Sequence, residues 1–223
     1  MQLNAAMIHS NNALVPDPNK VDPLASRPIF WPLLREGLRM TAWSDTGLKF
    51  YMVGNPLVWW LATLSVLLLV LFWFLHDVTQ KRGAPFISAE AWQDFKMSAA
   101  ILGGAYCLHY FPFWIMDRVT YLHHYLPSLY FSILSFGFLF DHLFPMSPAP
   151  TGAVLEVPLE KALEKPSVGR KTKLQDYLLF SMASGVTLAV FAVFLYFFPL
   201  PYGYPGPAVD MAKLKWVSSW NIA

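Results

Sequence analysis

Residues 117–131, DRVTYLHHYLPSLYF, place guanidinium, imidazole and phenol groups between two apolar stretches of the chain. The guanidinium of Arg118 is a fork of hydrogen-bond donors that suits a phosphate group. His123 and His124 add donors whose charge depends on pH, and Tyr121 and Tyr125 add neutral hydroxyl groups. This set predicts the binding of an anionic headgroup or a polar sugar. The alternative is a boundary position between lipid and water that carries no chemistry.

One further candidate, His109, precedes this cluster inside an apolar segment. Helical spacing places Tyr106, Tyr110 and Asp117 close to the same face as His109. An ionisable residue within a membrane helix is a candidate functional residue, and the alternative is a neutral histidine that bonds to a neighbouring helix. Pro112 cannot donate a backbone hydrogen bond, so we expect a kink in the helix at this position.

The histidine pair does not predict a metal site. Adjacent residues on a helix point about 100° apart, and no Cys, Asp or Glu adjoins the pair to complete a ligand set. The sequence also contains no phosphate-binding loop, dinucleotide fingerprint, nucleophile elbow or HExxH motif. We therefore assign no catalytic residue, metal ligand or cofactor within this chain. The net charge of +2 gives no indication of a nucleic-acid partner.

The composition indicates that a membrane positions these residues. Hydrophobic residues make up 56% of the chain and charged residues 13%, whereas soluble domains average about 25% charged residues. A helix that spans a bilayer needs about 20 mostly apolar residues. Four segments meet this need, namely 56–75, 97–116, 125–144 and 178–198. The fold class is therefore predicted to be an all-α membrane protein with four transmembrane helices.

The chain is predicted to comprise an arm (1–55), a four-helix domain (56–207) and a C-terminal tail (208–223). Within the arm, residues 27–55 mix Trp, Phe and Tyr with Arg and Lys, a composition that favours the membrane interface. We therefore expect the arm to be partly helical and to lie along the membrane surface.

Positive charges predict the orientation of the bundle. The connections 76–96 and 145–177 together hold eight Lys and Arg residues, and such connections stay in the cytosol. The stretch 117–124, the arm and the tail then face the lumen or the exterior. Small residues at helical spacing predict close helix packing in the third and fourth segments: Ser128, Ser132, Ser135, Ser181, Ser184, Gly185 and Ala192.

Several stretches resemble the C-terminal region of the protein O-mannosyltransferase family. They are SNNALVPDPNKVDPLASRP, WPLLREGLRM, GNPLVWW, HYFPFWIMDRVTYLHHYLPSLYF and the ending around YGYP, and they cover about residues 4–207 in the right order. The resemblance implies the C-terminal part of a GT-C type fold, in a multi-pass enzyme of the endoplasmic-reticulum membrane. It also implies that the stretch around LHHYLP is luminal.

The family resemblance further implies a glycosyltransferase activity. Members transfer mannose from dolichyl-phosphate-mannose, the donor, to Ser and Thr hydroxyls of proteins in the lumen, and they work as homo- or hetero-dimers. The family's acidic catalytic motif and its MIR region match nothing in this sequence. We therefore expect the chain to be a fragment or truncated product that contributes no catalytic carboxylate; the need for a divalent ion stays open.

Two hypotheses follow. In the first, the chain is the C-terminal membrane region of a mannosyltransferase, and candidate residues help to hold the lipid phosphate or the mannose: Arg118, Tyr121, His123, His124, Tyr125 and His109. In the second, the chain is a non-catalytic membrane scaffold that pairs with a full-length mannosyltransferase through the small-residue faces of its third and fourth helices.

Overall fold

The computed structural model describes residues 3–7, 19, 22–44, 47–116, 118–144 and 173–222. Asp117 and the connection 145–172 therefore lie outside the described residues. The α-helices are α2 (Pro56–Lys81), α3 (Ala89–Tyr110), α4 (Pro112–Ile115), α5 (Leu126–Leu143), α7 (Lys173–Phe197) and α8 (Pro199–Tyr202). Three short 3₁₀ helices are η1 (Pro28–Phe30), η2 (Leu122–Tyr125) and η3 (Ala208–Leu214). Strands β1 (Leu38–Arg39) and β2 (Tyr51–Met52) form an antiparallel pair.

Three segments of the described chain are long and apolar enough to cross a membrane: Pro56–Lys81, Leu122–Leu143 and Asp176–Phe197. The remaining predicted segment, 97–116, is represented by α3 and α4. With 22 residues, α3 is also long enough to span, but it begins at Ala89 and its first turns carry Glu90, Asp94 and Lys96. The sequence analysis placed these charged residues in the preceding connection. Since they belong to the helix instead, they lower its mean hydropathy.

The connection between the first two long helices is shorter than the predicted 76–96. Helix α2 continues to Lys81, and the Asp77–Lys81 ion pair (2.7 Å) one turn apart supports this extension. The next helix begins after Ser88, whose hydroxyl accepts a hydrogen bond from the Ala91 backbone N–H (3.3 Å). Both helices therefore extend beyond the apolar segments, and their outer turns carry polar side chains.

Asn55 begins α2 and also joins it to α7. Its Oδ1 accepts hydrogen bonds from the backbone N–H groups of Leu57 (3.1 Å) and Val58 (3.3 Å), and Pro56 occupies the first turn, where no backbone donor is needed. The Nδ2 group of Asn55 donates to the Val190 carbonyl (2.8 Å). One side chain therefore fixes both the start of a helix and a contact between two helices.

We expect the Asn55→Ala substitution to lower the free energy of unfolding by roughly 1–3 kcal/mol, because the cap and the bond to α7 are both lost. Ser88→Ala removes a cap alone and should cost about 1 kcal/mol. Asn55→Asp keeps the capping acceptor but loses the donor to Val190, so it should fall between the two. Denaturant titration of the three variants in detergent micelles measures the differences. Equal losses for Asn55→Ala and Asn55→Asp would contradict the dual role.

The small residues of α5 lie at a close helix contact. Ser128, Ser132 and Ser135 are fully buried, and the Ser65 hydroxyl of α2 donates to the Ser132 carbonyl (3.0 Å). Small side chains permit this approach of the two backbones, which confirms the packing interpretation for this helix. The corresponding face of α7 differs, since Gly185 is exposed and, of the described residues of that helix, Phe197 at its end is buried.

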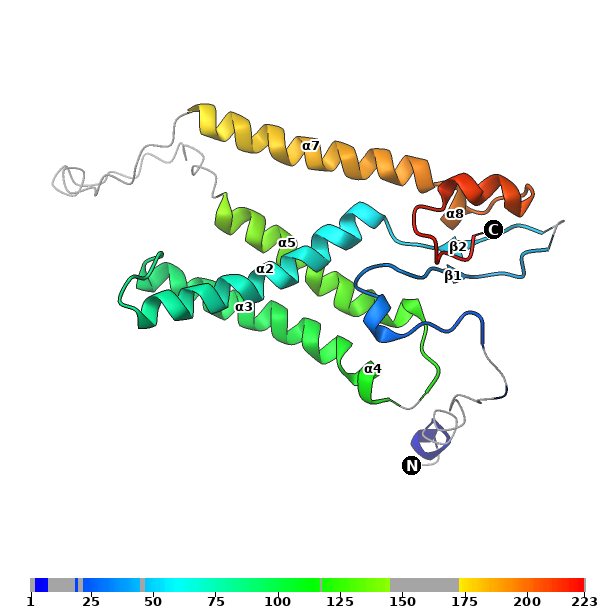
Figure 1. Cartoon of the computed structure of the whole chain (residues 1–223), viewed down its shortest axis with the longest axis horizontal. Coiled ribbons are helices and arrows are strands. Elements are labelled where there is room, and N and C mark those ends of the chain that lie inside the picture. The colour runs from blue at the N-terminus through cyan, green and yellow to red at the C-terminus, as the bar shows by residue number, and fades with distance from the viewer. Residues whose placement is uncertain are drawn as a thin grey trace.

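The arm, the hairpin between α4 and α5, and the tail pack together at one end of the bundle (Figure 1). The Trp220 indole donates to the Leu34 carbonyl (2.8 Å), and the Asn221 backbone N–H donates to the Tyr51 hydroxyl (3.1 Å). Lys49 also pairs with Tyr204 through an isolated antiparallel bridge. We call the arm and the tail together, residues 22–55 with 199–222, the cap. The sequence analysis treated the arm and the tail as separate parts and did not predict that they share a core.

Candidate functional site at the hairpin

The hairpin forms because proline residues stand on both sides of it. Helix α3 ends at Tyr110, and Pro112 begins the separate short helix α4. The missing N–H of proline breaks the ladder there, which confirms the predicted interruption. Pro127 occupies the first turn of α5, a position that proline tolerates. The polar residues of the hairpin are therefore held between α4 and α5, in a segment that includes the short 3₁₀ helix η2.

Tyr121, His123 and His124 form a stack of rings on this turn. The centroids of His123 and His124 are 4.3 Å apart, and those of Tyr121 and His123 are 5.7 Å apart. The Nδ1 atom of His124 lies 3.0 Å from the Tyr121 backbone nitrogen, and its ring packs against Phe113 (5.0 Å) and Trp31 (6.3 Å). His123 is exposed and His124 is half-buried. His123 is therefore available to a ligand, whereas His124 holds the turn in shape.

The phenol of Tyr121 ties the hairpin to the arm. Its hydroxyl donates to Asp22 Oδ2 (2.6 Å), and Asp22 Oδ1 accepts from the Leu24 backbone N–H (2.9 Å). The bond to Asp22 raises the pKa of Tyr121, while the charge of Arg118 acts in the opposite direction. Because the pKa is higher in the folded state than in the unfolded chain, the bond persists at neutral pH and is lost only as the phenol deprotonates in strong base.

Arg118 belongs to the same cluster, because its positive charge acts on both Tyr121 and His124. It lies three residues after the end of α4 and is half-buried. The structure thus brings four predicted residues together: Arg118, Tyr121, His123 and His124. These groups can supply donors to an anion.

The other two predicted residues lie elsewhere. Tyr125 is fully buried, and its hydroxyl lies 3.2 Å from that of Tyr106 while its ring packs against Trp59 (5.5 Å). It belongs to the core beneath the hairpin. His109 is exposed on α3 and stacks on Phe131 of α5 (5.4 Å). Its partner is thus an aromatic ring on the neighbouring helix rather than the hairpin.

Sequence reasoning missed the residues of the arm that support the hairpin. Thr120 and Ser26 exchange two hydrogen bonds, from the Thr120 hydroxyl to the Ser26 carbonyl and from the Ser26 backbone N–H to the Thr120 carbonyl, both 2.8 Å. The Ser26 hydroxyl accepts from the indole of Trp31 (2.8 Å), whose ring is fully buried. Trp31 opens the stretch WPLLREGLRM, but its aromatic character was interpreted as interfacial rather than as core.

The donors at the hairpin suit an anion better than a cation. Within the described ranges, no three His, Cys, Asp or Glu side chains lie close enough together to hold a metal ion. The guanidinium of Arg118 and the exposed imidazole of His123 instead offer hydrogen-bond donors on one turn.

A bundle of apolar helices with a folded cap and a cationic, aromatic turn defines a membrane-embedded region of a multi-span protein. Residues 1–220 match the family model described as the C-terminal four TMM region of protein-O-mannosyltransferase. The chain belongs to this family, which confirms the all-α membrane fold and the family resemblance of the sequence.

Similar proteins support this assignment. The chain is 34% identical over its whole length to dolichyl-phosphate-mannose–protein mannosyltransferase 3 of Saccharomyces cerevisiae, of which it covers 27%. It is 30% identical over 97% of its length to protein O-mannosyl-transferase 2 of Danio rerio, again covering 27% of that protein. The chain thus spans about a quarter of the length of the curated relatives it matches.

A solved structure has the same fold. It is the S. cerevisiae protein O-mannosyltransferase Pmt1-Pmt2 complex bound to the sugar donor, which aligns with a TM-score of 0.73 and 23% identity. The alignment covers 98% of this chain and 26% of that one. At this identity the likeness establishes the arrangement of the helices and the cap.

Proposed function

We propose that this chain is the C-terminal membrane region of a dolichyl-phosphate-mannose–protein mannosyltransferase of the endoplasmic-reticulum membrane. The complete enzyme would transfer mannose from dolichyl-phosphate-mannose to Ser and Thr hydroxyls of luminal proteins. The observation that carries this proposal is the family match over residues 1–220, together with relatives whose names state this donor and this transfer. The catalytic carboxylate would come from the part of the enzyme outside this region.

Within that enzyme, the hairpin would bind the phosphate or the mannose of the donor. Arg118 brings a guanidinium that can bond two phosphate oxygens at once. His123 is exposed beside it and supplies a further donor. Tyr121 and His124 keep this turn in place, because one bonds to Asp22 and the other packs on Trp31. His109 remains a separate candidate on α3, outside this group of contacts.

A second function, that of a non-catalytic scaffold, is favoured by the exposure of α7. Most of this helix is exposed or half-buried, and Ser181, Gly185 and Ala192 are exposed along it. Such small residues permit close approach of a partner helix in lipid. The partner would be another member of the family, in a homo- or hetero-dimer; the solved structural neighbour is itself a complex of two different members.

A chimeric enzyme separates the two functions. In the yeast mannosyltransferase 3, the matching C-terminal quarter is replaced by this chain, and transfer of labelled mannose to a Ser/Thr peptide is measured in membranes. We expect transfer to be retained, with the enzyme lacking this quarter as the inactive control. An inactive chimera that is nonetheless inserted and co-purifies with a full-length family member would support the scaffold and contradict the enzymatic role.

A further inference from the structure

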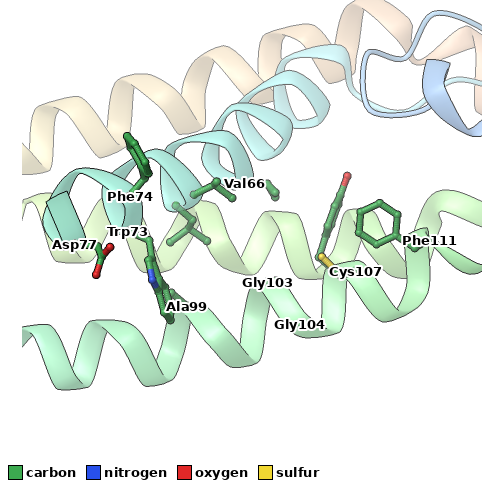
Figure 2. A pocket seen from close by; sticks show the side chains of 12 residues that line it. Val66, Trp73, Phe74, Asp77, Ala99, Gly103, Gly104, Cys107 and Phe111 are labelled. Carbon is green, nitrogen blue, oxygen red and sulfur yellow. The ribbon is translucent and has the colours of Figure 1, made fainter.

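Helices α2 and α3 line an open apolar cavity of about 510 Å³ (Figure 2). Figure 2 shows Trp73 and Asp77 toward one end and Cys107 and Phe111 toward the other. Two adjacent glycines of α3 line it, and a Cβ atom added at either one would meet no other atom within 4 Å. The cavity therefore exists partly because this helix presents no side chain there.

The length of this cavity corresponds to one leaflet of a bilayer. Along α2 its lining runs from Val66 to Asp77, a rise of about 16 Å at 1.5 Å per residue. The hydrocarbon core is about 30 Å thick, so each leaflet contributes about half of this depth. The Asp77 end lies at the turn between α2 and α3, which is the end of the bundle opposite the cap (Figure 1).

A second cavity, of about 520 Å³, adjoins the first at this same end, because Trp73 and Asp77 line both. Its walls are more polar than those of the first, with Gln80, Gln93 and Lys96 among the lining residues. The two cavities thus lie on either side of Trp73 and Asp77, one lined mainly by apolar residues and the other by more polar ones.

His76 lines the polar cavity and is only 1% exposed. Its ring stacks on Trp92, with centroids 3.9 Å apart. Its Nδ1 atom is buried and has no hydrogen-bond partner among the described residues. Leaving such an atom unsatisfied is unfavourable, so a ligand group that reaches it through a rotation of the ring would be stabilised.

The charge around the polar cavity favours an anion. Asp77 is paired with Lys81 (2.7 Å), so its negative charge is compensated. Lys96 lines the cavity, and an ammonium group there can bond to a phosphate oxygen. An anion placed between His76 and Lys96 would have a donor on each of the two helices.

We propose that these joined cavities bind one phospholipid molecule, with an acyl chain between α2 and α3 and the phosphate at His76 and Lys96. A phospholipid matches both parts, since its tail fills one leaflet and its phosphate reaches the polar end. The rival occupant is a transmembrane helix of a partner protein. Such a helix fits the apolar cavity but brings no anion to the second one. By the positive-charge pattern, this lipid belongs to the cytosolic leaflet, opposite the hairpin that would bind the donor.

Native mass spectrometry of the full chain in detergent tests the site with three probes: dioleoyl phosphatidic acid, dioleoylglycerol and inorganic phosphate. We expect retention of phosphatidic acid alone at low micromolar concentration, because only this probe fills both cavities. Equal retention of dioleoylglycerol would overturn the phosphate contacts. Retention of inorganic phosphate as strong as that of phosphatidic acid would overturn the role of the apolar cavity.

Matched variants locate the bound lipid. Gly103→Leu fills the apolar cavity and Lys96→Gln removes the cation; each should weaken retention of phosphatidic acid about tenfold. Two control variants match these changes. Gly185→Leu adds the same side chain on α7, where an added Cβ also meets no atom within 4 Å, and Arg82→Gln removes an exposed cation at the same end. Each control should change retention of phosphatidic acid less than about twofold. Equal losses in variants and controls would overturn the proposal.

His76 supplies a third variant that separates binding from folding. His76→Phe keeps the aromatic stack on Trp92 and removes the unpartnered nitrogen. We expect weaker retention of phosphatidic acid with an unfolding midpoint in lipid-free detergent that is equal to or higher than that of the unsubstituted chain, because a buried unsatisfied atom is removed. Unchanged retention would remove His76 from the site and overturn the phosphate position proposed here.

Discussion

Replacing Arg118 with Ala in a full-length enzyme that carries this region is expected to weaken binding of dolichyl-phosphate-mannose about ten- to hundredfold. A hydrogen bond to a charged group contributes about 1.5–3 kcal/mol, which corresponds to this range. The loss should be in affinity for dolichyl-phosphate-mannose, since the guanidinium of Arg118 supplies hydrogen bonds to the phosphate. Equilibrium binding of a fluorescent donor analogue to the purified enzyme measures the effect directly.

Three further variants make this result specific. Arg118→Lys keeps the charge but not the fork, so it should recover only part of the affinity. His123→Ala should weaken donor binding because its ring is exposed beside Arg118. Arg35→Ala removes an arginine of the cap that lies over the Phe30 ring and should leave donor binding unchanged. Full donor affinity in both Arg118→Ala and His123→Ala would rule out the proposed headgroup contact.

The second large effect concerns stability. Trp31→Ala is expected to lower the free energy of unfolding by about 3–5 kcal/mol, as for other large aromatic residues removed from a core. Trp31 is fully buried, and its ring contacts Phe113 (5.4 Å) and Tyr125 (6.3 Å). Its carbonyl accepts from the Trp59 indole (2.6 Å), so the arm, the hairpin and α2 all meet at this residue. Denaturant titration in micelles, followed by circular dichroism, measures the loss.

Trp60→Ala is the matched control for Trp31→Ala. Trp60 is 38% exposed, and its indole donates to the Leu33 carbonyl (2.9 Å), so its removal should cost about 1 kcal/mol. The His124 ring also stacks on Trp31, and hydrogen exchange of residues 118–125 should therefore rise in Trp31→Ala alone. Similar losses in the two variants would contradict the central position of Trp31.

Much of the fold could be predicted because the bilayer constrains helices strongly. Long apolar runs predicted α2, α5 and α7, and Pro112 predicted a kink at the position where α3 ends. The start of α3 could not be predicted from apolar character, because Ser88 caps a helix whose first turns are charged. Short-range capping decided this boundary, and hydropathy alone does not include it.

The sequence predicted which residue types form the candidate site, but it did not predict which of them are buried. The types of Arg118, His123 and His124 indicated a candidate site at the hairpin, since these residues lie close together in the sequence. The burial of Tyr125 depends on Tyr106 and Trp59, and the position of Tyr121 depends on Asp22, which is 99 residues away. Contacts between such distant residues leave no local pattern in a single sequence.

The joining of the arm to the tail determines when this protein can finish folding. The Leu34 carbonyl receives its bond from Trp220, 186 residues later, and the Arg39 guanidinium bonds to the Asn221 carbonyl, 182 residues later. The ribosome must therefore complete every membrane helix before the arm acquires these partners. A premature stop codon shortly before Trp220 would leave the Leu34 carbonyl and the Arg39 guanidinium without these partners, while the contacts of the arm with the hairpin could still form.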